Sequence, residues 1–296
     1  MRSLILHYVC FSVVTSLCTA QSLRGVVDIH AHSGPDSVPR SIDSLSLVRL
    51  ARERGYRGLV LKSHYESTAA LAGLARREAP GLAVFGGIAL NLTVGGINPA
   101  AVEHMAYVEG GFGKIVWMPT FDSENQVAFS KDHRPFVPIS RNGKLLPGVL
   151  HVLDIIAKHD LVLATGHSTA AENLLLIEAA RKRKIARIVV THAVLNPVSM
   201  TVEQAKKAAQ LGAYVEFVGN AVVGTTKSRD FKDYAAAMRE IGFDHVILSS
   251  DFGQRGNPLH PDGLEQVFAG LRQAGITEAE IEIMIKRNPA RLLGLD

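Results

Sequence analysis

Short apolar runs alternate along the chain with longer segments in which apolar residues recur at a helical period. The short runs are almost continuously apolar, which is typical of strands buried on both faces of a parallel sheet. There are eight, at residues 25–30, 58–62, 83–88, 114–118, 161–165, 187–191, 213–217 and 245–250. The pattern therefore predicts a parallel sheet of eight strands.

The segments between these runs are rich in Ala, Leu and charged residues. The clearest helical patterns lie at 41–55, 67–79, 170–184, 201–211 and 230–242, and three of them end at or beside Gly55, Gly212 and Gly242. Eight strand–helix units in about 270 residues predict a (β/α)8 TIM-like barrel in a single domain. The main alternative is an open doubly wound sheet, but the first run is not followed by the Gly-x-Gly-x-x-Gly pattern of its nucleotide-binding version.

One connection, at residues 120–147, is unusually long and has little helical period. It contains Arg141-Asn142-Gly143 between two short extended stretches, a pattern that predicts a small β-hairpin. It also holds Phe121, Phe129 and Phe136, so it is not purely polar. Long loops in compact domains are usually functional or disordered. We expect a lid-like loop over the barrel after strand four.

The first twenty residues differ from the rest. Arg2 is followed by a largely apolar stretch at 4–17 and by the small residues Thr19 and Ala20. This predicts a signal peptide at 1–20 that directs a barrel domain at 21–296 to a secreted or periplasmic location. An uncleaved membrane anchor is the alternative, but the stretch is short for a membrane span, so stable insertion is not expected.

Composition adds two limits. The 296 residues are 47% hydrophobic with a net charge of +4, which is ordinary for a globular protein and gives little reason to expect a nucleic-acid partner. Both cysteines, Cys10 and Cys18, lie in the predicted signal peptide, so a metal in the domain must be held by His, Asp or Glu. A small-molecule substrate is the expected partner, and the sequence leaves the oligomeric state open.

Candidate ligands stand where the predicted strands end. His30 and His32 are two apart on strand one and so share a face, while His167, His192 and Asp251 follow strands five, six and eight. A lone His at a strand end is more often structural, but these five positions would all meet at one face of a closed barrel. Imidazoles and a carboxylate suit a divalent metal. The sequence therefore predicts a metal site.

This ordered set resembles the amidohydrolase superfamily of metal-dependent hydrolases. The C-terminal stretch Asn288-Pro289-Ala290-Arg291-Leu292-Leu293-Gly294 is also similar to the usual ending of that superfamily. The resemblance extends over essentially the whole domain, and it is better at identifying the superfamily than the reaction.

The resemblance implies a role for each position. His30, His32 and Asp251 would bind a first divalent metal, most simply zinc, with manganese or iron as alternatives. His167 would be the next ligand. His192 would bind a second ion or polarise the substrate, so it is both a candidate ligand and a candidate catalytic residue. Asp251 would also take a proton from the attacking water. The resemblance leaves open whether the site holds one ion or two.

Strand two departs from this pattern. Strand four lacks the Lys that bridges two metals in many amidohydrolases, whereas strand two ends with Lys62 and His64 on one face. A His at that position, after Gly55-Tyr56, resembles the PHP phosphoesterases, but their Glu on strand three is absent. We take His64 as a candidate metal ligand and Lys62 as a substrate contact or modified ligand.

Three further residues have weaker claims. Trp117 either walls the pocket or packs in the core, and Arg134 in the long loop is a candidate for holding a substrate carboxylate or phosphate. Glu216 on strand seven faces either the barrel or the helices, because sequence does not fix strand parity.

The sequence thus predicts a hydrolase that uses metal-activated water on an amide, lactone or ester bond of a small molecule. Three alternatives remain open: a PHP-like phosphoesterase, a single-metal non-oxidative decarboxylase, and a barrel that binds without catalysis.

Overall fold

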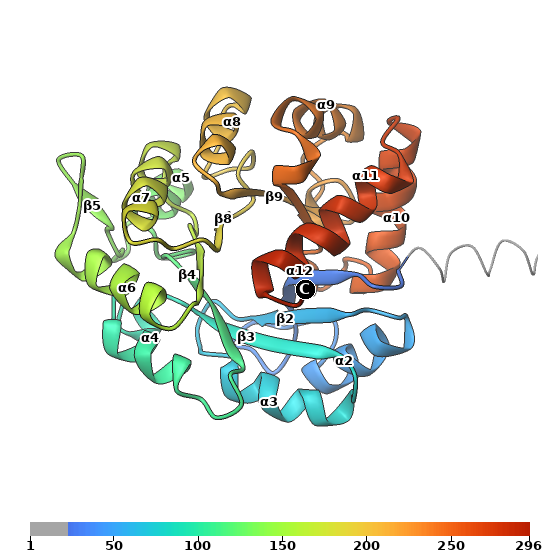
Figure 1. The fold of residues 1–296 in the computed structure, drawn as a ribbon, viewed down its shortest axis with the longest axis horizontal. Coiled ribbons are helices and arrows are strands. Elements are labelled where there is room, and N and C mark those ends of the chain that lie inside the picture. The colour runs from blue at the N-terminus through green and yellow to red at the C-terminus, as the bar shows by residue number, and fades with distance from the viewer. Residues whose placement is uncertain (1–22) are drawn as a thin grey trace, which may run out of the picture.

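A parallel barrel forms the centre of the molecule, as the computed structural model of residues 23–296 shows (Figure 1). The sheet runs in the order β1-β2-β3-β4-β7-β8-β9-β10. Its strands are β1 (Val27–His32), β2 (Gly58–Lys62), β3 (Ala83–Ala89), β4 (Gly113–Trp117), β7 (Val162–Ala164), β8 (Ile188–Val190), β9 (Tyr214–Val218) and β10 (Val246–Ser249). The predicted TIM-like barrel in a single domain is therefore confirmed.

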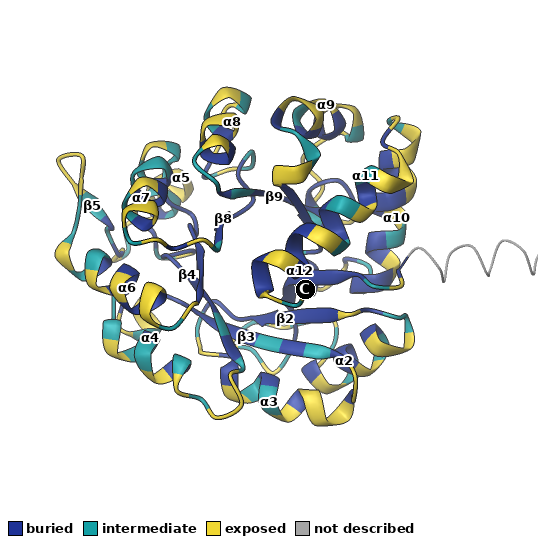
Figure 2. Cartoon of the chain, viewed as in Figure 1, coloured by how far each residue is buried: buried dark blue, intermediate teal, exposed yellow. Residues whose placement is uncertain are grey.

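Helices surround the barrel, with buried residues on their inner faces and exposed residues on their outer faces (Figure 2). They are α2 (Ser44–Glu53), α3 (Ala69–Glu78), α4 (Pro99–Ala106), α6 (Pro147–Lys158), α7 (Ala170–Lys182), α8 (Val202–Gln210), α9 (Phe231–Ile241) and α10 (His260–Gln273). Thr169 and Thr201 begin α7 and α8 with capping boxes, in which the Thr side chain and the third helical residue each accept a backbone N–H. These caps fix the residues at which two of the predicted helices begin.

The molecule has two hydrophobic layers. The larger lies between the strands and the surrounding helices, and the smaller fills the interior of the barrel. After α10 the chain continues through α11 (Glu278–Glu282), a π-helical turn at Ile283–Arg287 and α12 (Asn288–Leu293). Leu292 and Leu293 of α12 pack with Val27 and Ile247 in the inner layer, so the last helix closes one end of the barrel (Figure 1).

Strand β1 contains a bulge, and β1 also makes the seam where the barrel closes. Its pairing with β2 gains one residue between Asp28 and Ala31. Bulges re-aim side chains next to active sites, and here Ile29 packs inside the barrel while His30 faces its mouth. At the seam, Asp251 N donates to His30 O at 2.8 Å and His32 N donates to Phe252 O at 3.0 Å.

The segment after β4 corrects one expectation. It is not a loop without helix, because α5 spans Glu124–Ser130, beginning at a Ser123 side chain that accepts from Gln126 N. The predicted hairpin is present as β5 (Ser140–Arg141) and β6 (Lys144–Leu145). A seven-residue helix is too short to leave a clear period in the sequence, and contacts with the barrel hold it in place: Asn125 Nδ2 donates to His167 O at 3.0 Å.

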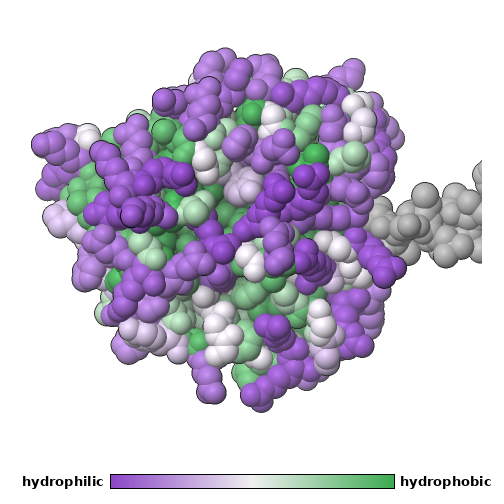
Figure 3. Space-filling model, in the orientation of Figure 1, coloured by the Kyte–Doolittle hydropathy of each residue, from purple (hydrophilic) through white to green (hydrophobic). Residues whose placement is uncertain are grey.

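The predicted signal peptide at 1–20 lies outside the described residues. Within residues 23–296, no helix combines the length and apolar character needed to cross a membrane. The face seen in Figure 3 is mostly hydrophilic, with small hydrophobic areas between the helices.

Candidate metal centre and active site

A cavity of about 240 Å³ opens at the carboxyl ends of the strands. The predicted ligands His30, His32, His64, His167, His192 and Asp251 all line it, and so does Lys62. Barrels of this type carry their active sites at this face because all strands point their carboxyl ends to it. The structure thus brings together every residue that the sequence nominated as a metal ligand.

His30, His32 and Asp251 form the tightest group. Asp251 Oδ1 lies 3.2 Å from His30 Nε2 and 3.2 Å from His32 Nε2, and ligand atoms of all three lie within 4.8 Å of one another. Ligands about 2.0–2.1 Å from a tetrahedral zinc ion are about 3.3 Å apart. The spacing of these atoms therefore fits a shared divalent cation.

Outer contacts fix which imidazole nitrogen faces the cavity. Glu216 Oε1 accepts from His30 Nδ1 at 3.0 Å, and the Lys62 carbonyl accepts from His32 Nδ1 at 3.1 Å. Both Nδ1 atoms are therefore the N–H donors, so the two Nε2 atoms are the ligating positions. Such contacts orient the ligands of metal sites and raise their basicity.

His167 and His192 make a second pair. Their Nε2 atoms are 3.1 Å apart, and the Nδ1 atom of His167 donates to Gln126 Oε1 at 2.9 Å. Glu216 Oε2 accepts from His192 N at 2.9 Å, so one carboxylate supports both His30 and His192. Glu216 is buried and faces the barrel, which settles the orientation that its sequence left open.

Burial and neighbouring charges shift the pKa values of these groups. Burial lowers the pKa of His32 to about 3 and that of His192 to about 4, so both imidazoles are neutral near pH 7. Burial would raise the pKa of Asp251, but His30 and His32 hold it well below its usual range. Burial also opposes protonation of His30, but Asp251 and Glu216 outweigh it and raise its pKa to about 9. The same negative charge favours a divalent ion.

Backbone conformations at the site are unusual. His192 has φ +26° and Asp251 has φ +49°, in a region that non-glycine residues seldom occupy. Gly166, with φ +66°, precedes His167, and a Cβ there would lie 2.3 Å from Met118 O. Such strain concentrates at functional sites and persists only where surrounding contacts enforce it.

Strand two contributes two buried side chains. Lys62 Nζ lies 2.8 Å from His30 Nε2, and burial lowers the pKa of its amine to about 8. His64 Nδ1 lies 2.8 Å from Thr120 Oγ1, and its ring stacks on Phe121 with centroids 3.8 Å apart. His64 lies beside the group of His30, His32 and Asp251 rather than in it. Its outward nitrogen is therefore free to contact a substrate or a second ion.

Two candidate substrate contacts lie elsewhere. Trp117 is buried in the inner layer of the barrel. Its ring centroid lies 5.2 Å from Lys62 Nζ, so the ring contacts the amine of Lys62. Arg134 pairs with Asp122 and donates to Phe121 O, and it lines neither this cavity nor its neighbour. These two contacts tie Arg134 to the segment around Phe121.

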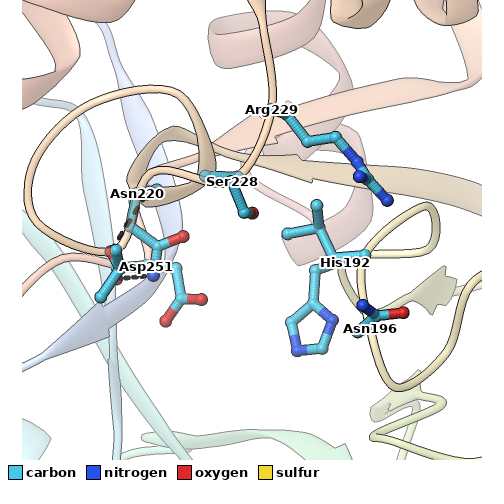
Figure 4. A pocket seen from close by; sticks show the side chains of 9 residues that line it. His192, Asn196, Asn220, Ser228, Arg229 and Asp251 are labelled. Carbon is cyan, nitrogen blue, oxygen red and sulfur yellow. Dashed lines mark hydrogen bonds between the residues drawn. The ribbon is translucent and has the colours of Figure 1, made fainter.

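Sequence reasoning missed several polar side chains of the site. Arg40, Asn196, Asn220 and Gln254 line the cavity from segments that follow the strands, and Gln126 lines it from helix α5. Asn196, Asn220, His192 and Asp251 also line a second cavity of about 250 Å³, which Figure 4 shows from close by. Asn220 Nδ2 donates to Asp251 O at 2.8 Å. The signal available was position alone: each lies in a segment that follows the carboxyl end of a strand.

Glu216→Gln is expected to weaken metal affinity about 10–100-fold while leaving the fold intact. The amide keeps the shape of the carboxylate but removes the charge that His30 Nδ1 and His192 N contact. The dissociation constant for zinc, measured by competition with a chelator, checks this. Glu178→Gln, on the exposed face of α7, is the matched control. An unchanged zinc affinity in Glu216→Gln would contradict the support assigned to this carboxylate.

Two family models match the chain. The family of unknown function DUF6282 matches residues 25–216, and the phosphotriesterase family matches residues 142–293. The first match contains His30, His32, His167 and His192, and the second contains His167, His192 and Asp251. Together the two matches cover almost all described residues. No curated protein matches the chain.

Solved structures share the fold at low sequence identity. An amidohydrolase from Pseudomonas aeruginosa is 14% identical, with 93% of this chain and 97% of that chain covered and a TM-score of 0.64. A probable dipeptidase from the same organism is 12% identical, with 95% and 98% covered and a TM-score of 0.64. The phosphotriesterase homology protein from Escherichia coli is 17% identical, with 90% and 98% covered and a TM-score of 0.59. These likenesses establish the barrel fold.

The eight-stranded barrel and the ligand group at its carboxyl face define a hydrolytic enzyme of the amidohydrolase superfamily, a class of metal-dependent hydrolases. Within it, the chain belongs to the family of unknown function DUF6282 and, through residues 142–293, to the phosphotriesterase family. The predicted superfamily and the prediction that the chain is a hydrolase are thereby confirmed.

Proposed function

We propose that the protein hydrolyses an amide, lactone or ester bond of a small molecule with a metal-activated water. The observation that carries this proposal is the 3.2 Å spacing of Asp251 Oδ1 from both His30 Nε2 and His32 Nε2, at the wall of a cavity of about 240 Å³. A cavity of this size suits a small substrate. Zinc is the ion that we propose, because imidazole nitrogen and carboxylate oxygen are its common ligands.

Each residue of the site has a separate task in this proposal. His30, His32 and Asp251 would hold the ion, which supplies positive charge that lowers the pKa of water from about 15.7 toward 7. Asp251 takes the proton of the attacking water at its carboxylate. The neutral imidazoles of His167 and His192, whose Nε2 atoms are 3.1 Å apart at the cavity wall, orient the carbonyl of the scissile bond. Lys62 and His64 contact the substrate from the side of strand β2.

A second candidate is hydrolysis of a phosphoester. The match to the phosphotriesterase family over residues 142–293 favours it. The same residues would serve, with Lys62 and His64 offering positive charge and a hydrogen bond to a phosphoryl oxygen. The two reactions differ in the group attacked, so a substrate panel separates them.

The test begins with the metal content of the purified full chain, measured by mass spectrometry of the elements. We expect bound divalent metal in stoichiometric amount, loss of activity on chelation, and recovery on addition of zinc. Activity is then measured on N-acetyl amino acids, aryl esters, γ-lactones and phosphate esters. Turnover of phosphate esters alone would replace the first candidate by the second. Absence of tightly bound metal together with activity insensitive to chelators would overturn both.

A further inference from the structure

The second cavity, which we call the side cavity, adjoins the candidate metal centre. His192, Asn196, Asn220 and Asp251 form the wall that it shares with the metal-side cavity. Its remaining lining comes from Leu195 and from the loop after β9, namely Ala221, Thr226, Ser228 and Arg229. A molecule with its reacting bond at Asp251 can therefore extend into the side cavity.

Charge is distributed unevenly in the side cavity. Figure 4 shows the guanidinium of Arg229 on the side of Asn196 and across the cavity from Asp251. Arg229 Nη2 donates to Val194 O at 3.1 Å, and no carboxylate of the described residues lies within ion-pair distance of its side chain. Its remaining N–H donors are thus available to an incoming group.

The backbone around Arg229 is held in place. Ser228 N and Arg229 N both donate to Ala221 O, at 2.8 and 2.9 Å. Thr226 Oγ1 donates to Asn220 O at 3.0 Å and accepts from Asn257 Nδ2 at 3.2 Å. The loop that carries Arg229 is therefore anchored to the residue next to the shared wall. The side chain of Arg229 is exposed, but its backbone is fixed, so fewer conformations are lost when it binds a ligand than would be lost from a mobile loop.

We propose that Arg229 binds a carboxylate of the substrate, so that the substrate class is a small acidic molecule. A guanidinium presents paired N–H donors in the planar geometry that a carboxylate accepts. Asn196 and Ser228 add neutral polar groups to the lining of the side cavity. Phe121, a residue that is 38% exposed, lines the metal-side cavity but not the side cavity, so we place the uncharged end of the substrate against it.

This assignment rests on the proposed function for the position of the reacting bond, but binding can be measured without turnover. The probes are N-acetylglycine and N-acetylglycinamide, which differ only in the carboxylate, and N-acetylaminomethylphosphonate, which carries a phosphonate instead. Dissociation constants for the zinc-loaded full chain come from saturation-transfer NMR titrations. N-acetylglycine is expected to bind at least about tenfold more tightly than the neutral amide, because it gains a hydrogen bond between charged groups.

Variants isolate the contribution of Arg229. Arg229→Gln is expected to bring the two dissociation constants to within about twofold, and Arg229→Lys to retain part of the preference. Lys232→Gln is the matched control, because it removes one positive charge from exposed α9 outside the cavity. An unchanged melting temperature of Arg229→Gln shows that a structural role at Val194 O does not explain the result.

The outcomes separate the two proposals. Tight binding of N-acetylglycine that depends on Arg229, without hydrolysis of any tested bond, would leave the carboxylate site standing and overturn the proposed reaction. Hydrolysis with equal affinity for the acid and the amide would overturn the carboxylate site alone. A preference that survives in Arg229→Gln, a preference for the phosphonate over the carboxylate, or no binding of any probe would also overturn it.

Discussion

Replacing His30 and His32 together by Ala is expected to abolish both metal binding and hydrolysis. The two Nε2 atoms lie with Asp251 Oδ1 in the tightest ligand group of the described residues, so the double variant leaves one carboxylate of that group. Metal analysis after purification should then give less than about a tenth of the wild-type content, and turnover should fall to the level of the apoenzyme.

The control for this variant is His104→Ala with His133→Ala, since both side chains are exposed and lie outside the site. Because loss of two buried imidazoles leaves a void, His30→Asn with His32→Asn is measured beside it, and circular dichroism reports the fold of each protein. A folded double variant that keeps stoichiometric metal and activity would show that the ion is held elsewhere.

Asp251→Asn is expected to lower kcat by about 10²–10⁴-fold, the range associated with loss of a general base. The substitution preserves shape and is suited to the backbone, because Asn tolerates the positive φ of +49° that Asp251 adopts. The effect therefore reports the loss of the carboxylate rather than a distorted strand end. Kinetic constants measured with added zinc separate slower chemistry from weaker metal binding.

Asp244→Asn supplies the comparison for Asp251→Asn. Asp244 is exposed in the short turn before β10, so its variant removes the same charge far from the cavity. We expect Asp244→Asn to retain full activity. If Asp251→Asn were equally active in saturating zinc, proton transfer by Asp251 would be ruled out.

The sequence predicted the structure best where candidate ligands follow strands that are recognisable as apolar runs. Buried parallel strands are nearly continuous apolar runs, so all eight strands could be placed, and ligands at their ends follow from the barrel itself. The prediction that His30 and Asp251 lie at the site depends on this rule alone. It also explains why His64 and Lys62 could be placed beside them.

Features that arise from contacts between distant segments were not predictable. The bulge in β1 depends on its pairing with β2, and the inward orientation of Glu216 depends on the parity of β9, which short strands do not reveal. Helix α5 has seven residues, which is too few for a period to be recognised. Arg134 was a candidate substrate contact because of its charge, and its ion pair with Asp122 could not be predicted from the sequence.

The seam between β1 and β10 joins the first strand of the barrel to the last, and the candidate ligands sit on both sides of it. Asp251 N bonds to His30 O, and Gly253 approaches so closely that a Cβ there would lie 2.0 Å from His32 O. The candidate ligand group thus joins residues that are more than two hundred positions apart in the sequence. A nascent chain that ends before residue 251 has His30 and His32 but no partner carboxylate. Metal should therefore bind only after the chain has been synthesised through residue 251. A product truncated before that residue would have no hydrolase activity.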